Sequence, residues 1–307
     1  MLKNLIFIIT IITVGFGMDY HLKPKQISPS VYMFAGHNEI VTKQNGGNIA
    51  NTYWINTGKH WVVIDSGATY DYALQAYNLM KRIANLPIKL VIDTHMHDDH
   101  WMGNSHYKAK HIPIYATTLQ SKTFHTGEQT RILRILDKKD LEDTKVVSID
   151  HIISQDTTLD IDGYKFDIVV LQQPAHTKQD MFIYMPKEKV LFSGDLLFSQ
   201  RVTSLRDGTI EGSLKSLDIL SKYDVKVWAN GHGKYTDLTA FNYMKSYLND
   251  LKSSALKAIE EDVELEDFIE NTKFEKYKDM KLFNRLNKAN LSQAYREYEF
   301  FEEDDEE

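Results

Sequence analysis

The chain has 307 residues, of which 42% are hydrophobic, and its formal net charge is −7. Residues 302–307 carry six of the acidic side chains, so the rest of the chain is close to neutral and has no basic stripe for nucleic acid. The absence of cysteine excludes disulfides and thiolate metal ligands. The length is compatible with one or two domains.

Residues 1–17 have the pattern of a signal peptide. Lys3 supplies a positive charge, an apolar run follows, and Gly15 and Gly17 precede a predicted cleavage site before Met18. The apolar run is short for a hydrocarbon layer of about 30 Å, which favours cleavage over anchoring. We therefore expect a periplasmic or secreted protein with no membrane association after cleavage.

The next part of the chain predicts strands over 27–36, 53–56 and 61–65, then a helix over 72–85. Residues 37–47 are polar and fit either an ordinary surface loop or a cover over a nearby pocket. Asp65 ends a predicted strand. We expect it to hold an active-site loop or a metal-binding histidine in place rather than to bind metal itself.

A short buried strand over 89–92 leads into the sequence HMHDDH at residues 95–100. Alternation along an extended segment directs His95 and His97 to the same side, and the turn that follows returns Asp99 and His100 towards them. Imidazoles and a carboxylate that converge at a strand end are typical of a site for a borderline divalent metal, by default zinc.

Three further predicted strands, over 168–171, 190–192 and 225–229, are followed by His176, Asp195 and His232. Because potential ligands recur just after buried strands, beside glycine or proline turns, we expect them to meet the cluster at 95–100. The remaining histidines lack this context, and we interpret them as surface or hydrogen-bonded structural residues: His21, His37, His60, His106, His111, His125 and His151.

The other segments are predicted to be structural. We expect a helix over 104–110, a strand over 112–116, a charged helical excursion over 117–145, a hairpin over 156–171 and a strand over 181–185. The main domain would span 18–240. Helical segments over 241–259, 265–271 and 291–301 would pack on it rather than carry chemistry, and 302–307 would form a disordered acidic tail.

The run His95-x-His97-x-Asp99-His100, with the later His176, Asp195 and His232, resembles the metallo-β-lactamase superfamily over essentially the whole mature chain. Within it, the stretches 47–51, 174–177, 193–196 and 290–299 resemble exported metallohydrolases found alongside sulfur-oxidation and quinoprotein systems. The resemblance implies an α+β fold, a four-layer αβ/βα sandwich with extra C-terminal helices.

The same resemblance implies a binuclear centre with two Zn²⁺ ions, or iron as the alternative metal. One metal would take His95, His97 and His176, and the other would take Asp99, His100 and His232. Asp195 would bridge both metals. Asp99 and Asp195 are the implied catalytic residues, and Asp99 would orient a metal-bound hydroxide or pass on its proton.

The implied reaction is hydrolysis of an ester, thioester, lactone or lactam-type bond in a small-molecule substrate. Asp195 argues against an efficient β-lactamase, because dedicated β-lactamases of this superfamily usually carry Cys or Ser at that position. Two alternatives remain open: a mononuclear iron dioxygenase acting on persulfides, and a non-catalytic periplasmic partner of a sulfur or quinoprotein system.

Overall fold

The computed structural model describes residues 17–123, 130–235 and 238–300. Residues 1–16 of the predicted signal peptide, His125 and the acidic tail over 302–307 lie outside the described residues. No helix in the described ranges combines the length and the apolar character needed to cross a membrane.

The first sheet contains seven strands in chain order. The strands β1 to β4 pair antiparallel, whereas β4, β5, β6 and β7 pair parallel. Their bounds are Lys25–Gln26 (β1), Val31–Phe34 (β2), Thr52–Asn56 (β3), Trp61–Ile64 (β4), Ile88–Ile92 (β5), Ile114–Thr117 (β6) and His151–Ile153 (β7).

The second sheet contains five strands in the order β12-β11-β10-β9-β8. The strands β8 to β11 pair antiparallel, and β11 pairs parallel with β12. Their bounds are Thr157–Ile161 (β8), Tyr164–Val170 (β9), Met181–Met185 (β10), Val190–Phe198 (β11) and Val227–His232 (β12).

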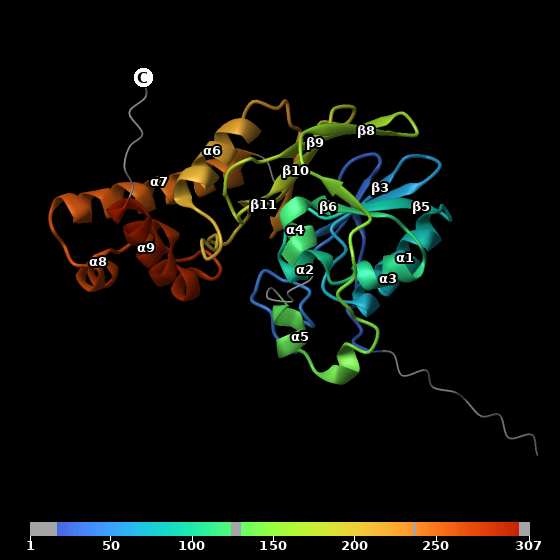
Figure 1. The fold of residues 1–307 in the computed structure, drawn as a ribbon, viewed down its shortest axis with the longest axis horizontal. Helices are drawn as coiled ribbons and strands as arrows, with labels where there is room; N and C mark the ends of the chain where they lie inside the picture. Colours follow the sequence, from blue (N-terminus) through green and yellow to red (C-terminus); the bar gives the residue numbers. More distant parts are fainter. Residues whose placement is uncertain (1–16, 124–129, 236–237, 301–307) are drawn as a thin grey trace, which may run out of the picture.

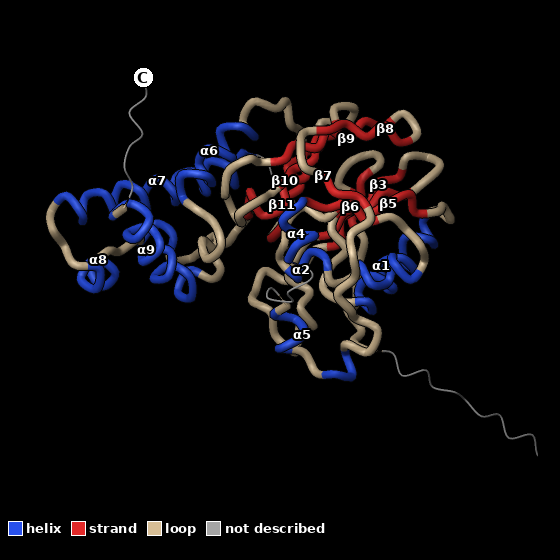
Figure 2. The backbone as a smooth tube through the Cα atoms, viewed as in Figure 1, coloured by secondary structure: helices blue, strands red, loops and turns tan. Residues whose placement is uncertain are grey.

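Helices cover the outer faces of both sheets, with α1 and α3 beside the first sheet and α6 and α7 beside the second (Figure 1; Figure 2). The α-helices are α1 (Tyr70–Ile83), α2 (Asp98–Trp101), α3 (Asn104–Ala109), α4 (Thr118–Thr123), α5 (Arg131–Ile135), α6 (Ile210–Leu220), α7 (Leu238–Glu260), α8 (Leu265–Asn271) and α9 (Phe283–Glu299). The short 3₁₀ turns are η1 (Lys138–Asp140) and η2 (Glu275–Tyr277).

Apolar side chains between these layers make the four-layer sandwich. Val62 and Ile92 of the first sheet and Phe192 of the second belong to one buried cluster between the sheets. Tyr72 and Met80 of α1 are buried in a second cluster on the outer face of the first sheet. The α+β sandwich with added C-terminal helices predicted from the sequence is confirmed.

Several element boundaries differ from the prediction, most of all those of β11 and α9. The strand β11 continues through Asp195 to Phe198 instead of ending at Phe192, with all nine of its residues buried and a register shift at Gly194. A pattern rule takes Ser-Gly-Asp as a turn, whereas here these polar groups are buried at the functional site. The helix α9 begins at Phe283 rather than at 291, because its first turns contain several polar residues that obscure the helical pattern.

Candidate metal centre

Seven side chains from four segments of the chain converge at one edge of the two sheets. Nitrogen or carboxylate atoms of each group lie within 4.8 Å of one another. The first group is His95, His97, His176 and Asp195, and the second is Asp99, His100 and His232. All of them are buried. The structure thus brings together every site residue that the sequence predicted.

In the first group, the imidazoles face each other at hydrogen-bonding distance or slightly beyond. The Nδ1 atom of His97 lies 3.2 Å from His95 Nε2 and 2.9 Å from His176 Nε2. The Oδ2 atom of Asp195 lies 3.2 Å from His176 Nε2 and 3.7 Å from His95 Nε2. Three ring nitrogens and one carboxylate oxygen therefore point at a common centre.

Asp195 also joins the second group. Its Oδ1 atom lies 3.2 Å from His100 Nε2, and its Oδ2 atom lies 3.1 Å from His232 Nε2. The Oδ2 atom of Asp99 lies 3.4 Å from His232 Nε2 and 3.7 Å from His100 Nε2. One carboxylate therefore lies between the two groups, as a residue shared by two metal ions would.

Glycines allow the strands to approach each other closely enough for this convergence. A Cβ atom at Gly194, whose φ is +49°, would lie 2.8 Å from Thr94 Cβ beside His95. A Cβ atom at Gly231 would lie 2.0 Å from Asp195 Oδ1. Side chains at these two positions would therefore push β11 and β12 away from the histidine cluster.

Further residues fix the orientation of the imidazoles. His100 Nδ1 lies 2.7 Å from Asp65 Oδ2, and His232 Nδ1 lies 2.8 Å from the carbonyl oxygen of Ile49. Each contact accepts the proton on Nδ1 and so leaves the lone pair of Nε2 free for the centre. Asp65 therefore holds a histidine in place, as the sequence predicted, and is not part of either group.

The sequence did not predict two other contacts to the centre. The Nε2 atom of His97 lies 2.9 Å from Asp207 Oδ2, which directs Nδ1 of this ring inwards. Arg131 contacts Oδ1 of Asp99 and, at 2.8 Å, Oδ1 of Asp98. Nothing in the local sequence marks Arg131 or Asp207, because both come from segments between predicted strands.

The electrostatics match a site that holds cations. Burial, together with the charge of His100, lowers the pKa of His95 well below its usual value, and burial lowers the pKa of His97 to about 4. Burial opposes ionisation of Asp195, but the neighbouring imidazoles of His232 and His100 lower its pKa. Burial disfavours a charge on His100, but the carboxylate of Asp195 raises the pKa of this imidazole well above its usual value. A divalent metal would therefore find His95 and His97 neutral and Asp195 ionised, and it would displace a proton from His100.

The donor set fits a pair of divalent metal ions. Five imidazole nitrogens and two carboxylates suit zinc or another borderline metal. His100 Nε2 and Asp195 Oδ1 are buried and lie 3.2 Å apart, yet neither makes a hydrogen bond to the other or to another described residue, although buried polar atoms are normally paired. A metal ligand role would account for both atoms.

One histidine outside the centre differs from its prediction. His106 is neither exposed nor hydrogen-bonded: it is fully buried, and both ring nitrogens lack a partner in the described part of the chain. Its ring lies against Tyr70, Tyr77 and Tyr107 instead. His106 is buried because it lies on the buried side of the helix α3, and its residue type alone did not indicate this.

Two stacked sheets with two buried groups of potential metal ligands at one edge define a class of proteins, and comparison with known proteins assigns the chain to it. The model of the Metallo-beta-lactamase superfamily matches residues 45–232, which is more than half of the chain. The chain belongs to this superfamily. The helices α7, α8 and α9 follow the matched residues.

Three similar proteins illustrate the range of the superfamily. The Beta-lactamase-like protein 2 homolog of Caenorhabditis elegans is 24% identical over 71% of this chain and 66% of its own length. A hydroxyacylglutathione hydrolase of Rhizobium meliloti (strain 1021) is 25% identical over 42% of each chain. The chain thus spans between two fifths and two thirds of these curated relatives. A solved metallo-beta-lactamase from Pontibacter korlensis has the same fold, with a TM-score of 0.61 at 20% identity, over 75% of this chain and 99% of that one.

Proposed function

We propose that this protein is a binuclear zinc hydrolase that cleaves an ester, thioester or lactone bond in a small-molecule substrate. The observation that carries the proposal is Asp195, whose two oxygens face nitrogens of both ligand groups. His95, His97 and His176 would bind one ion, Asp99, His100 and His232 the other, and Asp195 both. A similar protein is named a hydroxyacylglutathione hydrolase, which supports hydrolysis as the reaction class.

Two divalent ions bound there would supply hydroxide at neutral pH and polarise the carbonyl group of the substrate. The residues of the chain set the conditions for this chemistry. Burial opposes ionisation of Asp99, but the guanidinium of Arg131 and the imidazole of His100 hold its pKa below the usual range. Since Arg131 contacts Oδ1, only Oδ2 of Asp99 faces the histidines. This oxygen is placed to orient the attacking group or to accept its proton.

A carboxylate at position 195 favours these bonds over β-lactams. The solved metallo-beta-lactamase from Pontibacter korlensis is 20% identical, and such likeness supports the fold alone. The resemblance to exported hydrolases of sulfur-oxidation and quinoprotein systems remains a prediction. No described contact favours the iron dioxygenase or the non-catalytic partner, so we keep these two as outcomes of the test.

The test combines metal analysis with a substrate panel of thioester, lactone, ester, lactam and persulfide compounds. We expect about two zinc ions per chain and hydrolysis of at least one substrate, lost with a chelator and restored by Zn²⁺. Asp195→Asn should lower kcat by at least about 100-fold, more than the loss of a residue behind a ligand. The exposed His151→Gln serves as the control and should leave kcat unchanged. One iron ion per chain with persulfide oxidation, or full activity in Asp195→Asn, would refute the proposal.

We also propose that the protein is exported, which residues 1–17 support by their charge and apolar pattern. N-terminal sequencing of protein from the outer cell fraction should begin at Met18. Recovery of the uncut chain from the cytoplasm would contradict export and would leave the hydrolase proposal intact.

A further inference from the structure

Beside the metal centre lies a cavity of about 530 Å³, within the size range of small-molecule sites. Five arginines line it, and the acidic side chain in its lining is Glu39. The arginines come from three parts of the chain: Arg131 from α5, Arg201 and Arg206 from the segment after β11, and Arg285 and Arg296 from α9. We call this cavity the arginine pocket.

The arginine pocket adjoins the metal centre through three contacts. Arg131 is paired with Asp99, and Arg206 Nη2 lies 3.3 Å from His97 Nε2. The carbonyl of Ile49, a pocket residue, contacts His232 Nδ1 at 2.8 Å. Glu39, Ile40 and Val41 also border the pocket, so the 37–47 segment covers part of it and is not only a surface loop.

Arg201 is the residue in the pocket that most clearly indicates a bound anion. Only 7% of it is exposed, and its Nε and Nη1 atoms have no hydrogen-bond partner in the described residues. Its guanidinium lies 5.4 Å from the centre of the Phe198 ring, a cation–π contact that provides no hydrogen-bond acceptor. A buried guanidinium without acceptors is costly, because burial has removed its hydration. Asp195 and Asp99 attract it from a distance, but no described carboxylate forms an ion pair with it.

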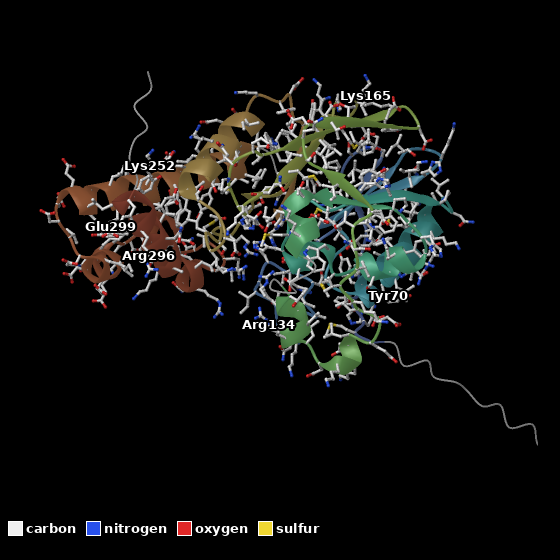
Figure 3. All side chains as sticks on the ribbon, viewed as in Figure 1. Tyr70, Arg134, Lys165, Lys252, Arg296 and Glu299 are labelled. Carbon is white, nitrogen blue, oxygen red and sulfur yellow. The ribbon has the colours of Figure 1, made fainter. Side chains whose placement is uncertain are left out.

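The helix α9 contributes two more arginines to the lining, and both are exposed to solvent and form no ion pair within the described ranges. Arg285 and Arg296 are eleven residues apart, about three helical turns, and therefore lie on the same face. Ala289 lies between them and leaves space in the wall of the pocket. Figure 3 shows Arg296 on α9. This helix lies outside the residues that match the superfamily model, so the two arginines are a feature of this chain's own C-terminal part.

The pocket is preformed rather than assembled by its ligand. The backbone N–H of Val202 donates to the carbonyl of Lys281, and the backbone N–H of Lys281 donates to the carbonyl of Gln200. This β-bridge fixes the backbone of Arg201 beside the start of α9. Asn290 of α9 donates to the carbonyl of Thr203 at 2.8 Å. These bonds hold cationic groups close together in the absence of an anion, as a binding site requires.

We infer that the arginine pocket binds a doubly negative group, a phosphate or a pair of carboxylates, at the end of the substrate distant from the bond to be cleaved. A guanidinium binds such oxygens bidentately, and Arg201, Arg285 and Arg296 together exceed what one carboxylate can accept. The inference rests on the proposed function, since the substrate of the metal centre would be the occupant.

Binding without turnover tests the inference independently of hydrolysis. The ligands for calorimetry on the metal-loaded protein at pH 8 are phenylphosphonate and isophthalate, both dianions, and benzoate, a monoanion of similar size. We expect at least one dianion to bind about 10-fold or more tightly than benzoate, and the tighter dianion identifies the group. Equal affinity for the three ligands would overturn the inference.

Substitutions locate the bound dianion. Arg285→Gln and Arg296→Gln should each weaken its binding about 10- to 100-fold. Arg134→Gln, on the exposed side of α5 and outside the pocket lining, is the matched control (Figure 3). The metal-site variant His176→Gln should keep the affinity within about threefold. Loss in His176→Gln with retention in the arginine variants would place the anion on the metals and refute the pocket.

Arg201→Gln gives a second readout that does not depend on binding alone. The dianion should raise the melting temperature of the wild-type protein but not that of Arg201→Gln, because ligand binding stabilises the folded state only where the site is intact. An equal rise in both proteins would contradict the role of Arg201. If the anion binds as expected and no substrate is hydrolysed, the proposed function fails and the binding site stands.

Discussion

Replacing Asp65 by Asn should weaken metal binding in one half of the proposed centre. Asp65 accepts from the backbone N–H of Thr94 through Oδ1 at 2.8 Å and contacts His100 Nδ1 through Oδ2 at 2.7 Å. In the variant, the amide oxygen stays opposite the N–H of Thr94, so the NH₂ group must face His100. Two donors then meet, and the imidazole relieves this by moving its proton to Nε2, the atom that faces Asp99 and Asp195.

The expected loss is 10- to 100-fold in affinity for the metal at Asp99, His100 and His232, or about 1.4–2.7 kcal/mol. Metal content measured against buffered free Zn²⁺ should show one tight ion retained and the other weakened, with kcat lowered in step. The control is Asp162→Asn. Asp162 Oδ2 lies 2.8 Å from His60 Nδ1, and this pair is not part of the centre. If Asp65→Asn binds two ions with wild-type affinity, the tautomer argument is wrong.

Two further substitutions test the packing around the site. His106→Phe should become more stable relative to wild type as the pH falls, because burial lowers the pKa of His106 to about 4. The imidazole of the unfolded chain takes up its proton near pH 6.5. The free energy of unfolding of the wild type should therefore fall by about 2 kcal/mol between pH 7.5 and pH 5, relative to that of the variant. Urea titrations at both pH values measure this difference. Glu297 of α9 accepts from the N–H groups of Ile210 and Glu211 at 2.8–3.0 Å and so caps α6. Glu297→Gln should cost about 1 kcal/mol in the same assay, while the exposed Glu299→Gln should cost nothing measurable.

Short-range patterns predicted most of the sandwich and the members of the centre. The strands β5, β9 and β12 each contain a short apolar run, at 90–92, 168–170 and 227–229, and the ends of such strands meet at one edge of stacked sheets. His95, His176 and His232 could therefore be grouped from the sequence. Asp65 could be assigned to support a ligand for the same reason, since β4 is the parallel neighbour of β5.

The surroundings of the centre could not be predicted, because they depend on contacts between remote segments. Arg131 is one charged residue in a charged stretch until the fold places it against Asp99, 32 residues earlier. Arg285 and Arg296 belong to an amphipathic helix whose polar face resembles any solvated surface. That face differs from an ordinary surface because the buried guanidinium of Arg201 lines the same pocket. The backbone bridge between residues 201 and 281, which fixes this arrangement, has no local sequence signal. The candidate metal ligands follow from strand ends, whereas the pocket proposed to bind the substrate depends on how a helix outside the sandwich contacts the segment after β11.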